Sequence, residues 1–187
     1  RVLFRSDISL PRSQDLKTAA RRRDFTMNAL MQDVLTGEIL DFFGGIEDIH
    51  SKLIRHVDDN TFIEDPLRVF RAAQFAARFN FRITRDSLEF MSSIDTYEIS
   101  KERIFAELEK VLLKANKPSI FFKELRRMTQ LVPWLQEVKY LIGVGQNEFY
   151  HPEGDVFNHT MQVIDEAARV RDKASNSLYF MLAALCH

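Results

Sequence analysis

EDPLRVFRAAQFAARFNF, residues 64–81, predicts the helix around which the other segments are arranged. Asp65 is a natural N-cap and Pro66 suits the first helical turn. At about 100° per residue, one sector of roughly 120° holds four long polar side chains, and almost all other positions are Ala, Val, Leu or Phe. The four are Arg68, Arg71, Gln74 and Arg78. Because buried guanidinium groups need anionic or polar partners, the pattern indicates a mostly buried helix whose arginine stripe lines a cleft.

The residues before this helix favour a small sheet. NALMQDVLTGEILDFFGG, residues 28–45, places a Thr36-Gly37 turn between two apolar pairs, which predicts a β-hairpin. IEDIHSK (46–52) predicts a short helix, and LIRHV (53–57) predicts a third strand.

Everything after residue 64 has a helical hydrophobic period. We therefore predict a mostly α protein with a small β portion (α+β): the edge of a sheet domain, a helical body, and the start of another helical domain near residue 145. The linker candidate is 143–155, rich in Gly and polar residues. The predicted helices span roughly 66–79, 84–94, 100–114, 117–128, 156–172 and 176–187.

Composition and charge narrow the function classes. The chain has 187 residues, 45% hydrophobic and 28% charged, as in ordinary globular proteins. Its net charge of −1 argues against a uniformly basic nucleic-acid binder, but residues 1–28 hold seven Arg or Lys against three Asp, a local charge of +4. Such local charge is expected where phosphates are held.

Location follows from similar evidence. The single cysteine, Cys186, suggests a reducing compartment, and no apolar run approaches the roughly 18 residues of a membrane span. We therefore predict a cytoplasmic protein without membrane contact. Because the chain starts at Arg1 and an apolar helix pattern runs to His187, we expect a piece of a longer protein.

Asp65 and Arg68 form a candidate base-reading pair. Three positions apart, they lie on one helix face and offer an acceptor beside a donor. The pairing edges of cytosine and adenine present an amino donor beside a ring-nitrogen acceptor, whereas guanine and uracil present the reverse. The pair therefore suits C and A. The alternative is that Asp65 is only a cap and that the arginines pair with acids on neighbouring elements.

Four motifs in order resemble the class II tRNA nucleotidyltransferases, which include the bacterial CCA-adding enzymes and the poly(A) polymerases. The motifs are RRDFTMNAL (22–30), ILDFFGGIEDIHSKLIRHV (39–57), the 64–81 helix and SKERIFAELEKVLL (100–113). The resemblance implies the C-terminal part of a nucleotidyltransferase head domain over 1–62, a helical neck and body over 63–144, and the truncated start of an HD domain over 145–187.

The resemblance also implies roles for single residues. Arg23 matches an arginine that contacts the incoming nucleotide, with Asp24 and Asn28 in the same ribose-facing motif. Asp65 and Arg68 match a pair that acts as an amino-acid template for C and A. Arg71 matches a further nucleotide-binding arginine. Some relatives carry arginine at Gln74, and Arg21 and Arg22 fit a solvated basic turn equally well.

The family's catalytic signature, a Gly-Ser loop with two metal-binding aspartates, does not occur in this sequence. Nucleotidyl transfer with two metal ions needs such carboxylates. We therefore expect Mg²⁺ to be bound mainly outside this chain, and the fragment alone to be inactive. The pairs Glu47-Asp48 and Asp58-Asp59 are interpreted as solvated surface.

The end of the chain resembles the opening of an HD domain, in which histidines on two helices bind a divalent metal. His159 and His187 match those histidines, and the aspartate that should follow His187 lies beyond the sequence. A lone histidine on an amphipathic helix is more often structural. Phe149 and Tyr150 in the linker are candidates for stacking on bases.

The resulting hypothesis is a tRNA nucleotidyltransferase that adds C and A from CTP and ATP to the 3′ end of tRNA. One alternative is an A-only or CC-only adding enzyme, or a poly(A) polymerase. Another is a metal-dependent HD phosphohydrolase with an RNA-binding module upstream.

Overall fold

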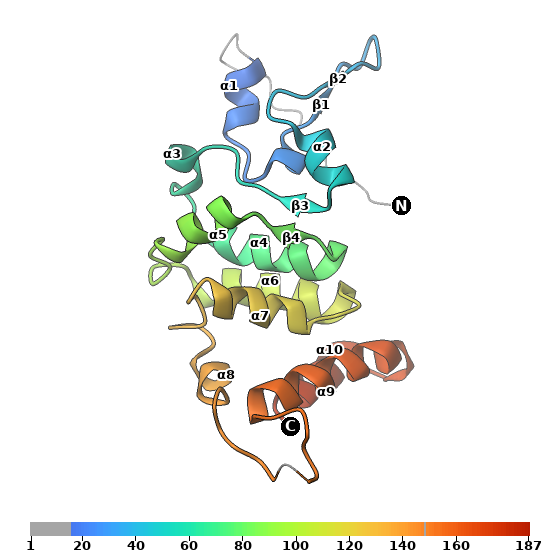
Figure 1. Ribbon diagram of the computed structural model, residues 1–187. Helices are drawn as coiled ribbons and strands as arrows, with labels where there is room; N and C mark the ends of the chain where they lie inside the picture. Colours follow the sequence, from blue (N-terminus) through green and yellow to red (C-terminus); the bar gives the residue numbers. More distant parts are fainter. Residues whose placement is uncertain (1–15, 148) are drawn as a thin grey trace.

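The computed structural model describes residues 16–147 and 149–187. The segments are stacked in chain order, from the sheet-containing N-terminal part to the last two helices (Figure 1). The fold is α+β, as predicted: helices dominate and the strands are short. No helix in the described ranges is both long enough and apolar enough to cross a membrane.

The predicted hairpin is confirmed. β1 (Met31–Gln32) pairs antiparallel with β2 (Ile39–Leu40). The turn between them includes Gly37 at φ +75°, a left-handed conformation that favours glycine. The Asp33 carboxylate accepts hydrogen bonds from two backbone N–H groups of the turn, and these bonds lower the pKa of Asp33. The hairpin projects away from the stacked helices in Figure 1.

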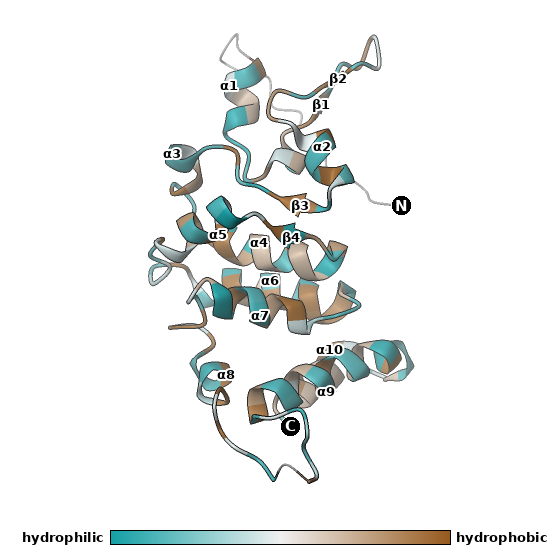
Figure 2. Cartoon of the chain, viewed as in Figure 1, coloured by the Kyte–Doolittle hydropathy of each residue, from teal (hydrophilic) through white to brown (hydrophobic). Residues whose placement is uncertain are grey.

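The third predicted strand exists but has a different partner. β3 (Leu53–Ile54) pairs in parallel with β4 (Arg82–Ile83), so the expectation that everything after residue 64 is helical was wrong here. The reversal occurs at Asn80, whose left-handed backbone (φ 55°) ends the preceding helix and turns the chain back toward β3. Figure 2 shows β3 in brown, and Ile54 and Ile83 are buried in the core.

The long helix is α4 (Leu67–Phe79), and it forms the centre of the molecule. It packs against α6 (Lys101–Lys114) and α7 (Ser119–Arg127). The cap position is Pro66 rather than the predicted Asp65, although the Asp65 carboxylate still accepts from the Leu67 N–H at 3.3 Å.

The other predicted helices are confirmed, with ends shifted by at most two residues. The short helix predicted over 46–52 is confirmed as α2 (Gly45–His50). Three further helices were not expected from the sequence because each is only four to six residues long: α1 (Leu16–Arg21), α3 (Asp59–Phe62) and α8 (Gln136–Tyr140). The remaining long helices are α5 (Arg85–Ser92), α9 (Val156–Val170) and α10 (Ser177–Leu185).

Polar contacts connect α9, and Arg171 directly after it, to the body. The Asp165 carboxylate accepts from the backbone N–H and the hydroxyl of Ser119 at the start of α7, at 2.9 and 2.7 Å. Arg171, which is 8% exposed, donates to the carbonyls of Leu112 and Ala115 at the end of α6. The apolar core also continues from the body into the last helices.

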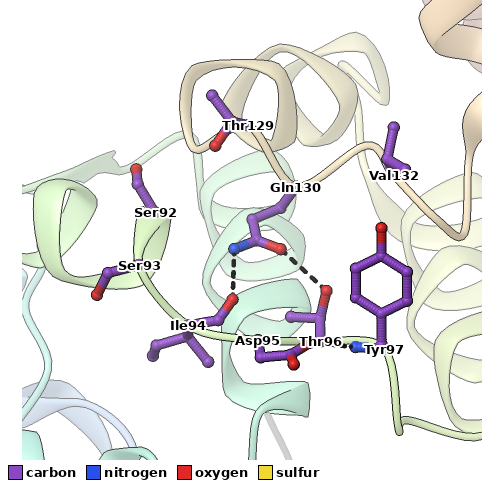
Figure 3. Close-up of a pocket in the computed structure, with 9 residues that line it drawn as sticks. All are labelled: Ser92, Ser93, Ile94, Asp95, Thr96, Tyr97, Thr129, Gln130 and Val132. Carbon is purple, nitrogen blue, oxygen red and sulfur yellow. Dashed lines mark hydrogen bonds between the residues drawn. The ribbon is translucent and has the colours of Figure 1, made fainter.

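A polar pocket of about 270 Å³ lies where the α5–α6 connection meets the end of α7 (Figure 3). Gln130 is buried there, and its amide donates to the carbonyls of Met91 and Ile94 and accepts from the Thr96 hydroxyl. Because these bonds use both N–H groups and the carbonyl, Gln130 serves to hold the loop in place.

Candidate functional site

A buried carboxylate joins the RRDFTMN segment to α4. Asp24 is 7% exposed; its Oδ1 accepts from the Phe25 N–H and from the Asn28 amide, both at 2.9 Å. Its Oδ2 accepts from Arg71 Nε at 2.8 Å and Nη2 at 2.7 Å. The structure thus brings together three residues that the sequence selected, Asp24, Asn28 and Arg71, as one cluster.

Arg71 remains accessible within this cluster. Its side chain is 31% exposed, and its guanidinium lies 5.2 Å from the centre of the Phe75 ring. The carboxylate and the ring restrict the side chain, while the exposed part is free to meet a ligand. An arginine held in this way loses less conformational entropy when it binds an anion.

The candidate base-reading pair is engaged with other parts of the protein. Asp65 accepts from Arg103 Nη2 at 3.0 and 2.9 Å, and both side chains are partly exposed. Arg68 donates to the backbone carbonyls of Arg22 and Thr61. In the structure both side chains therefore have partners within the protein, although Arg68 bonds to backbone carbonyls rather than to the acids of the alternative interpretation.

The basic segment, Arg21–Arg23, exposes its side chains to solvent, while its backbone carbonyls accept hydrogen bonds from the rest of the protein. Arg21, Arg22 and Arg23 are all exposed. The Arg21 carbonyl accepts from the Thr61 hydroxyl at 3.0 Å, and the Arg22 carbonyl accepts from Arg68. Three positive side chains therefore face outward directly beside the Asp24 cluster.

Gln74 does not line a cleft. It is 1% exposed, and its Nε2 has no hydrogen-bond partner. The polar sector drawn from a helical wheel was too wide, because α4 is covered by both α6 and α7 and only a narrow face remains open. Arg78 is half-buried, with its guanidinium 5.3 Å from the centre of the Phe79 ring.

Asp48 was predicted to be solvated surface and is instead buried, at 4% exposed. It accepts from the Thr26 hydroxyl at 2.7 Å and from Arg55 Nε at 3.1 Å. Gly45 explains the approach: a Cβ there would lie 2.3 Å from the Thr26 carbonyl oxygen, so only glycine lets α2 pack this closely on the RDFTMN turn. The stretch GGIED (44–48) was the feature of the sequence that could have indicated this close packing and the burial of Asp48.

Its neighbours behave more nearly as expected. Glu47 is exposed, and Asp59 is exposed beside His56. Asp58 is half-buried and caps α3, accepting from the Thr61 N–H at 3.1 Å.

A histidine cluster lies at the start of α9. The rings of His159 and His187 have centroids 5.9 Å apart, so the two predicted metal ligands lie close together. Two residues that the sequence did not select join them: Glu153 Oε1 lies 2.6 Å from His159 Nδ1 and 3.2 Å from His151 Nδ1. Its own backbone N–H and then the ring of His159 lower the pKa of Glu153 to about 2.

Comparison with known proteins identifies the relatives of this chain. Residues 4–55 match the poly A polymerase head domain. The chain is 39% identical over 191 residues to the multifunctional CCA protein of Actinobacillus pleuropneumoniae serotype 5b, covering 98% of this chain and 44% of that protein. This chain is a relative of the multifunctional CCA proteins.

Further comparisons give proteins of the same kind. The multifunctional CCA protein of Burkholderia pseudomallei (strain 1106a) is 43% identical over 176 residues, covering 89% of this chain and 41% of that protein. A solved tRNA nucleotidyltransferase complexed with a primer tRNA and an incoming ATP analog superposes with a TM-score of 0.64 at 26% identity, covering 91% of this chain and 49% of that one. The chain thus spans less than half the length of these CCA-protein relatives.

Sequence reasoning missed several residues that shape the site in this relative of the CCA proteins. Arg103 lies in the quoted SKERIF motif, but nothing in the sequence indicated that it would reach Asp65, 38 positions earlier. His151 and Glu153 had a usable signal, since H-x-E followed by a histidine six residues later places metal-binding side chains in one turn and the helix after it.

Proposed function

We propose that this chain supplies the nucleotide-binding and base-selecting part of a tRNA nucleotidyltransferase, which adds C and A from CTP and ATP to the 3′ end of tRNA. The observation that carries the proposal is the Asp24–Asn28–Arg71 cluster, with three exposed arginines beside it. The names of the relatives support the same activity. A cytoplasmic location accords with these substrates and with the single cysteine.

The charges suggest how a nucleotide is held. Arg23 contacts the ribose or phosphates from the exposed basic segment, and Arg71 contributes the accessible part of its guanidinium. Asp24 keeps Arg71 oriented and holds the Asn28 amide at 2.9 Å. In this arrangement the arginines recognise what CTP and ATP share, so base selection has to come from other groups.

Base selection falls to Asp65 and Arg68, after they exchange partners. The Arg103–Asp65 pair is exposed by 50% and 34%, and exposed ion pairs contribute only about 0.2–1 kcal/mol. A hydrogen bond between a charged group and a base contributes about 1.5–3 kcal/mol. A C or A base that bonds to Asp65 therefore compensates for displacing Arg103. When Arg68 turns to the base, it gives up its hydrogen bonds to the carbonyls of Arg22 and Thr61, which then face solvent.

Mg²⁺ is proposed to be bound by carboxylates outside this chain. In the described part, Asp24 and Asp48 are both occupied by arginine and other donors, so neither is free for an ion. When bound, Mg²⁺ activates the attacking 3′-hydroxyl and stabilises the leaving pyrophosphate. At the other end of the chain, His159 and His187 remain proposed ligands of a divalent metal.

The test measures incorporation of all four nucleotides into tRNA by the full-length protein. Wild type is compared with Asp65→Ala, Arg68→Ala and the reversed pair, Asp65→Arg with Arg68→Asp. We expect the single changes to relax the preference for C and A and the reversed pair to favour G and U, since each misplaced polar partner costs about 1–3 kcal/mol. Arg85→Ala, in an exposed pair on α5, is the matched control.

The same assay separates the alternatives. A CCA-adding enzyme extends tRNA lacking CCA with both CTP and ATP, a CC-only enzyme stops before A, and an A-only enzyme requires tRNA ending in CC. A poly(A) polymerase makes longer runs of A. If the preference for C and A survives every change at Asp65 and Arg68, the pair has only a structural role. No nucleotide addition by the full-length protein would contradict the transferase proposal itself.

A further inference from the structure

The Gln130 pocket, the cavity of about 270 Å³ beside that side chain, has a fixed wall (Figure 3). Gln130 is 5% exposed; its amide donates to the carbonyls of Met91 and Ile94 at 3.0 and 2.8 Å and accepts from the Thr96 hydroxyl at 2.9 Å. Trp134 Nε1 also donates to the Thr96 carbonyl at 2.8 Å. These bonds join the α5–α6 connection to the chain after α7, so the pocket exists before any ligand enters it.

The side chains that line this pocket offer acceptors rather than donors. Three of its hydroxyl groups already donate their single proton to backbone carbonyls: Ser92 to Leu88 at 2.8 Å, Ser93 to Phe90 at 2.7 Å and Thr129 to Met128 at 2.6 Å. A hydroxyl oxygen whose proton is engaged can still accept a hydrogen bond. The Thr96 hydroxyl and both Gln130 N–H groups are engaged as well. Within the described ranges, the Tyr97 hydroxyl is therefore the one side-chain donor of the lining that remains without a hydrogen bond.

A carboxylate adds negative charge to the lining. Asp95 is exposed, and its Oδ1 accepts from the Tyr97 N–H at 2.9 Å, which leaves Oδ2 available to a ligand. Among the residues that the structure describes, no Lys, Arg or His lines the pocket. An anion would therefore meet mostly acceptors and a like charge, whereas a cation would meet acceptors for its N–H groups and an opposite charge.

The pocket also has an apolar side. Tyr97 is 65% exposed, and Figure 3 shows its ring beside Val132, on the same side of the Gln130 amide. The face of an aromatic ring attracts a cation, and apolar surface packs against the methylene stem of a long cationic group. The cavity volume is below the roughly 300–1,000 Å³ of sites for drug-sized molecules, so it suits a small ligand.

We propose that the Gln130 pocket binds a small organic cation, a primary ammonium group on a short alkyl chain. The ammonium carries three N–H donors and no acceptor, so it complements the serine and threonine oxygens and the Asp95 carboxylate. Its methylene chain packs against Tyr97 and Val132. The proposal does not depend on nucleotide transfer, because no lining residue belongs to the Asp24 cluster or to the base-reading pair.

The experiment uses full-length protein without tRNA or nucleotides, in excess Mg²⁺ and at physiological ionic strength. Binding is measured by saturation-transfer NMR, which observes the ligand and detects weak complexes. The probes are putrescine, a diol of the same chain length, and inorganic phosphate. We expect putrescine to bind with a millimolar dissociation constant and the uncharged diol to bind about tenfold more weakly, because it lacks charged hydrogen bonds. Phosphate should not compete with putrescine.

Two variants test the lining. Asp95→Asn removes the charge and keeps the acceptor for the Tyr97 N–H; we expect putrescine binding to weaken about two- to fivefold, the range for an exposed ion pair. Tyr97→Leu removes the aromatic face and should weaken binding by about the same factor. Both positions are exposed, so the variants should unfold at the same urea concentration as wild type. Asp86→Asn, an exposed carboxylate on α5 outside the lining, is the matched control and should leave binding unchanged.

A lysine side chain of another protein carries the same ammonium chemistry as a free amine, so acetyl-lysine methylamide is a further probe. Tighter binding of putrescine would identify a free amine as the ligand, and tighter binding of the lysine derivative would identify a protein side chain. If neither binds, the proposal is overturned. It is also overturned if the diol binds as well as putrescine, if phosphate competes, or if Asp95→Asn has no larger effect than Asp86→Asn, since the attraction would then be a general property of the surface.

Discussion

Replacing the buried carboxylate of Asp24 tests whether the RRDFTMN segment (22–28) is held against α4 through Arg71. In Asp24→Asn the side chain keeps its size but loses its charge, which leaves Arg71 without its counter-ion. Removing one partner of a fully buried pair costs about 3–5 kcal/mol. Because the Arg71 side chain is 31% exposed, solvent compensates in part. We expect the free energy of unfolding to fall by about 2 kcal/mol.

A double-mutant cycle isolates the pair. Asp24→Asn, Arg71→Met and the double variant are unfolded with urea, and the coupling energy is calculated from the four stabilities. Residues in direct contact couple by about 0.5–3 kcal/mol, and we expect a value above 1 kcal/mol. The control is Arg85 with Glu89, an exposed pair at 2.8 Å on α5, for which about 0.3–0.5 kcal/mol is expected.

Two results would refute this reasoning. A coupling energy for Asp24 and Arg71 no larger than that of the control pair would show that burial adds nothing to the contact. Full stability of Asp24→Asn would show that Asn28 and the Phe25 N–H, the other partners of the carboxylate, hold the turn without the charge.

Three more predictions concern neighbouring positions. Arg23→Ala in the full-length protein should weaken the use of CTP and ATP together, by about 1.5–3 kcal/mol in kcat/KM for a lost charged contact, and a loss confined to one nucleotide would contradict a role at the ribose or phosphates. Gly45→Ala should destabilise by about 1–3 kcal/mol in urea unfolding because its Cβ would meet a carbonyl oxygen at 2.3 Å, whereas Gly145→Ala, where nothing lies within 4 Å, should not. Burial raises the pKa of Asp41, but hydrogen bonds from backbone N–H groups at the start of α2, that of Ile46 first, lower it by more, so the net pKa lies below the ordinary value of an aspartate. Wild type should therefore be more stable than Asp41→Asn above about pH 4, and this difference should vanish as the pH falls through the lowered pKa. A difference that does not change with pH would contradict a charge effect.

Local patterns in the sequence predicted most of the fold. The hairpin was predicted because a Thr-Gly turn between apolar pairs is a local signal, and the long helices because each repeats its apolar period over several turns. The pairing of β3 with β4 could not be predicted in the same way. Two-residue strands have no measurable period, and their partners lie 29 positions apart at Leu53 and Arg82.

The site was predicted in part, for a related reason. Motif resemblance selected Asp24, Asn28 and Arg71, and the structure joins them. Helical periodicity alone could not place Gln74, because burial at one position depends on how many helices cover α4. The partner of Asp65 also depends on tertiary packing: Arg103 belongs to α6, and its reach across to α4 follows from the contact between the two helices.

The arginines of the proposed binding site also hold the fold together, and this affects how variants should be interpreted. Arg71 binds Asp24, and Arg68 binds the Arg22 carbonyl, so both fasten the basic segment to α4. A change at either residue therefore lowers activity in two ways: by removing a ligand contact, and by loosening the segment that carries Arg23. The two causes separate in the measurements. Loss of a ligand contact lowers kcat/KM without changing the free energy of unfolding, whereas loosening changes both and should be reproduced by Asp24→Asn, in which the arginines themselves are intact.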